Sequence, residues 1–134
     1  MANALYDKGR EKFLSGSISW SGDTIKVALV DTASYTANLS TDEFYSSVSA
    51  AVVGTPQTLG SKTVTAGVAD AADPTFTAVT GASCEAVVIY KDTGVAATSP
   101  LIAYIDTATN LPVTPNGGDI GITWDSGSNK IFKL

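Results

Sequence analysis

The residue types that catalysis most often uses are scarce in this sequence. It contains no histidine and a single cysteine among 134 residues. Nucleophilic catalysis of the Ser–His–Asp or Cys–His type needs an imidazole, and a transition-metal site needs several His or Cys ligands, so both chemistries are excluded. A serine–lysine pair stays conceivable because Lys26, Lys62 and Lys91 are present, but no spacing singles one of them out.

Carboxylates are the next candidates. Glu11, Glu43 and Glu85 could in principle supply the acid and the base of a glycoside hydrolase. A single glutamate on a strand, such as Glu85, more commonly faces solvent or pairs with a cation. No catalytic residue is therefore assigned, and we expect that the chain is not an enzyme.

Two acidic turns raise the question of calcium. Asp70 with Asp73, and Asp92 with Thr93, could each contribute oxygen ligands, of which calcium needs six or more. Neither turn resembles an EF-hand loop, and surface turns use aspartate to bond their own backbone. We therefore predict neither a metal site nor a cofactor and leave calcium as an open alternative.

The lone Cys84 lies in an apolar run with no cationic neighbour, and we expect a small buried hydrophobic residue there. The aromatic residues have two interpretations, a sugar-binding platform on a β-sandwich or burial in the core or a subunit contact. Trp124 alternates in phase with Ile120 and Ile122, which favours burial, whereas Trp20 lies at the mouth of a predicted hairpin and could be exposed. Of the two interpretations, burial or subunit contact is favoured. The other rings considered are Tyr35, Tyr45, Tyr90 and Tyr104.

The net charge and the distribution of apolar residues argue against nucleic acid and against a membrane as partners. The formal net charge is −5, and no basic run extends beyond Lys8, Arg10 and Lys12, so nucleic acid is not an expected partner. No apolar stretch approaches the roughly 20 residues that cross a bilayer, and no secretory signal is evident, so we expect no membrane and synthesis in a cytosol. The length predicts a single domain over residues 1–134.

An amphipathic helix is predicted over about residues 4–15, capped by Asn3 and ended by Gly16 in a left-handed conformation. Leu5, Gly9 and Phe13 recur at spacings of four. This apolar side either docks on the domain itself or reaches a neighbouring subunit.

Beyond Gly16 the hydrophobic period becomes two, which is typical of strands. We predict a hairpin in which residues 18–20 and 24–31 flank the turn Ser21-Gly22-Asp23. The continuous apolar run of residues 83–91 predicts a strand covered on both faces, paired with 101–106. The other expected elements are a short helix over 42–48, a loop or edge strand over 50–56, strands over 62–67 and 75–79, a turn over 69–74, and a last hairpin of 119–124 with 130–134.

Several short strands joined by turns predict a mainly β domain, an antiparallel sandwich or barrel. Both ends of the chain also resemble a family of small virion proteins of tailed bacteriophages, some of which are capsid cement or decoration proteins. The resemblance rests on "ALYDKGREKFLSG" followed by "WSGDTIKVALVD", and on the ending "GGDIGITWDSGSNKIFKL". It implies an antiparallel β-sandwich of jelly-roll type with a short N-terminal helix.

The same resemblance implies a protein on the outer surface of the virion capsid. It would bind the major capsid protein, self-associate as a dimer or trimer, and stabilise the head. The alternatives are a tail or neck structural protein and a carbohydrate-binding module. The expected contact residues belong to the N-terminal helix, the first turn region and the C-terminal edge: Tyr6, Arg10, Phe13, Trp20, Phe132 and Leu134.

Overall fold

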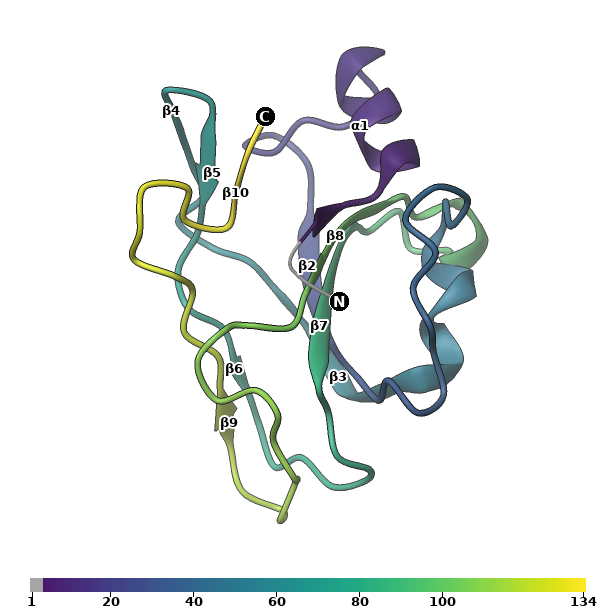
Figure 1. Cartoon of the computed structure of the whole chain (residues 1–134), viewed down its shortest axis with the longest axis vertical. Coiled ribbons are helices and arrows are strands. Elements are labelled where there is room, and N and C mark those ends of the chain that lie inside the picture. The colour runs from purple at the N-terminus through teal and green to yellow at the C-terminus, as the bar shows by residue number, and fades with distance from the viewer. Residues whose placement is uncertain (1–3) are drawn as a thin grey trace.

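A five-stranded antiparallel sheet forms the centre of the computed structural model, which describes residues 4–134 (Figure 1). Its three inner strands are β2 (Ile25–Val30), β7 (Ala86–Lys91) and β8 (Leu101–Ile105), and its outer strands are β1 (Ala4–Leu5) and β3 (Val52–Thr58), in the order β1-β8-β7-β2-β3. Nearly every residue of the inner strands is buried, because both faces of this sheet are covered.

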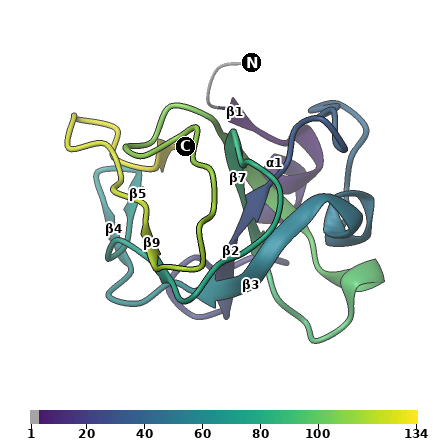
Figure 2. The same cartoon turned by 90° about the horizontal axis from the view of Figure 1, so that it is seen from below.

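Two smaller antiparallel sheets cover one face of the central sheet (Figures 1 and 2). One contains β4 (Thr63–Thr65), β5 (Val68–Asp70) and β10 (Phe132–Lys133), and the other pairs β6 (Thr75–Phe76) with β9 (Ile120–Gly121). The larger hydrophobic core lies between these layers and takes Val27, Leu29 and Ile89 from the central sheet.

The opposite face is covered by irregular chain and short 3-10 helices (Figure 1). These helices are η1 (Tyr45–Ser47), η2 (Ser49–Ala51) and η3 (Ala96–Thr98). A second hydrophobic cluster lies here, and Ala28, Val30 and Val88 point into it while their neighbours in sequence point to the first. The two-sided burial predicted for residues 83–91 is therefore confirmed, as is the β7–β8 hairpin.

The single α-helix, α1, spans Asp7–Leu14, which is shorter than the predicted range of 4–15. Ala4–Leu5 pairs with β8 as a strand instead, and Tyr6 holds the N-cap position in an extended conformation. The backbone N–H of Tyr6 donates to Ile102 O at 3.0 Å, so bonds to other elements replace the first helical turn. The predicted cap, Asn3, lies outside the described residues.

The predicted end of the helix is confirmed. Gly16 has φ +81°, and its N–H donates to Phe13 O at 3.2 Å. The N–H of Ser17 donates to Lys12 O at 2.8 Å. These two bonds form a Schellman motif, which satisfies carbonyls that the last helical turn leaves without partners.

Several predicted pairings are wrong. Residues 18–20 form no strand, so the first hairpin is absent and β2 pairs with β3 and β7. The predicted last hairpin is also absent, because β9 pairs with β6 and β10 pairs with β5. β5 (Val68–Asp70) overlaps the start of the turn predicted over 69–74. Residues 42–48 give one 3-10 turn, whereas the predicted edge strand near 50–56 is present as β3.

The chain is thus mainly β, with antiparallel sheets and one short α-helix among the described residues. The order of its strands does not confirm a sandwich or a jelly roll.

Candidate protein-binding face

The three glutamates considered for catalysis each have a local structural contact. Glu11 pairs with Lys8 at 3.2 Å, and Glu43 pairs with Lys12 at 2.9 Å. Glu85 accepts hydrogen bonds from the backbone N–H and the hydroxyl of one residue, Thr32, at 3.0 and 2.9 Å. The last contact ties the start of β7 to the end of β2.

The acidic turns considered for calcium are engaged by the protein itself. Asp73 accepts the backbone N–H of Trp124 at 3.0 Å. Asp92 accepts the N–H of Gly94 and pairs with Lys26 at 3.0 Å, and these contacts lower the pKa of its carboxyl. Within residues 4–134 no group of three or more His, Cys, Asp or Glu side chains could hold a metal ion.

Both tryptophans lie in the core and hold the same segment of chain. Trp20 is 4% exposed and Trp124 is 6% exposed, so the burial predicted for Trp124 is confirmed and Trp20 is buried too, which excludes the exposed alternative considered for it. The Trp20 indole donates to Asp70 O at 3.1 Å, and the Trp124 indole donates to Ala72 O at 3.2 Å. These indoles fix the chain between β5 and β6.

The other aromatic rings and the thiol are also internal. Tyr35, Tyr90 and Tyr104 are buried, and Tyr45 stacks on Tyr90 with ring centroids 4.0 Å apart. Cys84 is fully buried, as predicted, and burial raises the pKa of its thiol to about 11. A thiol with this pKa is protonated and unreactive near neutral pH.

Tyr6 does not lie on the surface, contrary to its predicted contact role. It is fully buried, and its hydroxyl lies 2.7 Å from that of Tyr35, which donates to Asp42 at 2.7 Å. Burial raises the pKa of both phenols far above the usual value. This network joins β1 to the segment that covers the second cluster.

The remaining five predicted contact residues lie together around the ring of Phe132. Its centroid is 5.9 Å from that of Phe13 in α1 and 5.2 Å from that of Trp20, which it meets edge to face. Arg10 and Leu134 line a hollow together with Phe13. The N-terminal helix and the C-terminal strand, which are separated by most of the sequence, therefore form one surface.

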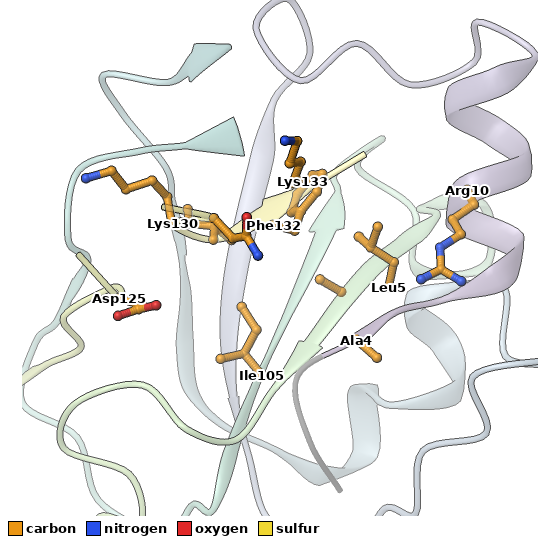
Figure 3. A pocket seen from close by; sticks show the side chains of 11 residues that line it. Ala4, Leu5, Arg10, Ile105, Asp125, Lys130, Phe132 and Lys133 are labelled. Atoms are coloured by element: carbon orange, nitrogen blue, oxygen red, sulfur yellow. The ribbon is translucent and has the colours of Figure 1, made fainter. Parts of the chain in front are cut away.

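We call this surface the α1–β10 face, and three adjoining hollows mark it. The first, of about 320 Å³, lies between β1 and β10 (Figure 3). The second, of about 350 Å³, lies between α1 and the β4–β5 hairpin, and the third, of about 420 Å³, lies between α1 and the chain end. The face comprises Arg10, Phe13, Leu14, Val64, Phe132, Lys133 and Leu134, and Trp20 forms its floor.

Large apolar side chains are exposed mainly on this face. Leu14 is 90% exposed, Val64 60% and Leu134 62%, and among the described residues only Val95 elsewhere is comparable, at 57%. Leu14 and Val64 were not predicted as contact residues. Leu14 carries a usable signal, since it is an apolar residue in the last helical turn before Gly16; Val64, between two threonines, carries none.

The α1–β10 face is also the basic part of an acidic protein. Three of the eight cationic side chains, Arg10, Lys130 and Lys133, line its hollows, together with one of the thirteen acidic ones, Asp125. Arg10 pairs with Asp7 at 3.2 Å, but both side chains are half exposed. No ion pair among the described residues involves Lys130 or Lys133. Their charge is available to a partner.

Within the described part of the chain, no helix is both long and apolar enough to span a membrane. No protein-family profile matches the chain, and no curated protein matches it.

Proposed function

We propose that this protein is a structural component of a bacteriophage virion that binds the outer surface of the major capsid protein lattice and stabilises the head. The observation that carries the proposal is the α1–β10 face, where exposed apolar side chains occur together with two lysines that form no ion pair within residues 4–134. The sequence resemblance to virion proteins supports it independently, because the segments that carry the resemblance include α1 and β10.

The physical requirements of such a role are modest. A cement protein binds in many copies, so each contact can be weak while the lattice gains a large total stabilisation. Leu14 and Val64 belong to an α-helix and a paired strand, so their backbone is already ordered before binding. A patch of this kind on a small protein is typical of a protein-binding site.

The finer structural and assembly expectations belong to the same proposal. The central sheet faces two smaller sheets, which supports the sandwich-like part of this proposal, and the jelly-roll type is implied by the sequence resemblance alone. Self-association as a dimer or trimer would place several α1–β10 faces over one lattice junction.

The test uses heads that lack this protein. Purified protein is added to the heads, and bound copies are counted after sedimentation. Saturable binding in hundreds of copies supports the proposal. Absence of binding to heads, or a few copies located in the tail or neck, contradicts it and favours the other virion role.

Point variants locate the contact better than a deletion of the N-terminal segment, because removing it would also remove β1 from the central sheet. Leu14→Ser is the test variant, and Val95→Ser is the matched control, since Val95 is also exposed but lies in the loop before η3. Binding should fall for the first variant only.

A further inference from the structure

The first hollow of the α1–β10 face runs between two strands that end different sheets. β1 is one of the two outer strands of the central sheet, and β10 is one of the two outer strands of the three-stranded sheet. Leu5 of β1 and Phe132 and Lys133 of β10 line the hollow from opposite sides (Figure 3). An outer strand offers backbone donors and acceptors on its open side, and extended peptides bind to such edges.

The second hollow is an apolar pocket beside the first hollow. Phe13, Trp20 and Phe132 line it, and the exposed Val64 stands at its rim. Its volume of about 350 Å³ lies within the range of pockets that hold ligand groups. Because Phe132 lines both hollows, a chain that lies along the first can place one large apolar side chain in the second.

The charges that line the first hollow determine which sign of charge a partner should carry. Lys130 and Lys133 form no ion pair with any residue of the described range 4–134. Figure 3 shows Arg10 across the hollow from Phe132 and Lys133. A second copy bound here about a two-fold axis would bring lysine against lysine, which is repulsive. Carboxylates on a different surface would instead be attracted to the first hollow.

From these observations we propose that the α1–β10 face binds an extended segment of its partner in which one large apolar side chain is flanked by carboxylates. The apolar side chain enters the pocket of Phe13, Trp20 and Phe132, and the carboxylates pair with Arg10, Lys130 and Lys133. The inference rests on the proposed function in so far as that partner is a capsid subunit.

The test is an NMR titration of the whole isotope-labelled protein with three synthetic peptides. The probe is acetyl-Glu-Asp-Phe-Asp-Glu-amide. One control replaces the central Phe by Ala, and the other replaces the four acidic residues by Lys. The acidic Phe peptide should shift the amide signals of Phe13, Phe132 and Lys133 and the indole signal of Trp20, and it should bind about tenfold more tightly than either control.

Two charge variants test the electrostatic part. Lys133→Glu should weaken binding of the acidic peptide about tenfold and remove most of its advantage over the basic peptide, because Arg10 and Lys130 are then balanced by Asp125 and the new glutamate. Lys8→Glu is the matched control, because it makes the same change in net charge at a residue that lines none of the three hollows. Lys8 pairs with Glu11, and its replacement should leave the peptide affinity unchanged. Raising the salt concentration should weaken binding to the unaltered protein.

The inference is overturned by equal binding of acidic and basic peptides, by shifts confined to other surfaces, or by no shift at peptide concentrations up to about 5 mM. Failure of the proposed function gives a different pattern, in which the acidic peptide binds the first hollow as expected but the protein does not bind heads. Heads that bind the protein and its Lys133→Glu variant equally would instead reject this inference and leave the proposed function standing.

Discussion

Replacing Gly9 with alanine should destabilise the protein, although alanine is the better helix former. Gly9 is the only buried residue of α1 and lies directly on β8. A Cβ atom at this position would lie 2.6 Å from Leu101 O and 3.2 Å from Ile102 Cα. Both are backbone atoms of an inner strand of the central sheet, so they cannot rotate away as a side chain can.

The expected magnitude follows from two opposing effects. Alanine in place of glycine favours an isolated helix by about 1 kcal/mol. Ordinary contact begins near 3.4 Å, so α1 must move away from β8 by roughly 0.8 Å, and overpacking of this kind costs about 1–3 kcal/mol. The shift also opens the packing of Phe13 on Phe132, which adds to the cost. We expect a net loss of about 1–2 kcal/mol and a fall in Tm of about 5 °C.

Urea denaturation followed by tryptophan fluorescence measures this loss. The matched control is Gly60→Ala, because a Cβ atom at Gly60 meets nothing within 4 Å; it should leave stability unchanged or raise it by up to about 1 kcal/mol. Amide signals of Phe13 and Phe132 should shift in the first variant only. A Gly9→Ala protein as stable as the original would refute the close packing of α1 on β8.

Three further results are expected. Phe132→Ala should lower the free energy of unfolding by about 2 kcal/mol in urea titrations, because a half-buried ring that packs on Trp20 is lost, and an unchanged midpoint would contradict that packing. A thiol reagent at pH 8 should label Cys84 only in the urea-unfolded protein, since burial raises the pKa of this thiol to about 11; labelling of the native protein would disprove it. Burial raises the pKa of Tyr35 and of the other internal tyrosines, so the stability from keeping them neutral should be complete below about pH 10, the unfolded value, and be lost at higher pH. Urea midpoints measured from pH 7 to 11 would show this fall. Tyr35→Phe should cost about 1–3 kcal/mol at pH 7, because the buried Tyr6 hydroxyl loses its partner and, among the described residues, Asp42 keeps only the backbone N–H of Asn38 as a donor.

Sequence patterns predict best those strands whose own residues are apolar on both faces. The run around Val87 and Ile89 is apolar on both faces, and such a run is stable only inside a covered sheet. β7 and β8 are consecutive strands of the chain joined by a single loop, so their pairing as a hairpin is also predictable from the sequence. The end of α1 at Gly16 followed for a similar reason, since glycine adopts a left-handed conformation at little cost.

The short strands were harder to predict because their partners are distant in sequence. β10 pairs with β5 at Phe132 and Ala69, and β6 pairs with β9 at Phe76 and Ile120. Strands of two or three residues carry too few alternations to fix a partner or a register. The prediction of where α1 begins was wrong for a different reason. Leu5 fits a helical spacing of four, yet its segment pairs with β8 as a strand, and the hydrogen bonds and burial of that pairing outweigh the helical pattern.

For the α1–β10 face, too, the sequence indicates individual residues but not the contacts between segments that are distant in the chain. Phe13 and Phe132 were chosen from two separate elements as apolar residues near the ends of the chain, and only the topology brings their rings to 5.9 Å. Tyr6 was chosen from the same helix pattern, but it precedes the helix and points inward. Sequence alone also could not show that Lys130 and Lys133 lack ion-pair partners, because that depends on which acidic residues lie near them.

The position of the α1–β10 face follows from how the central sheet is covered. Because β2, β7 and β8 are buried on both faces, neither face of this sheet is open to a partner. Protein contacts must then use the covering layers or the sheet edges. The groove lined by Leu5 of β1 and Phe132 of β10 lies at one such edge. Leu14, Val64 and Leu134, which line the second and third hollows, stay exposed in the domain, and a partner that covers them would complete their burial.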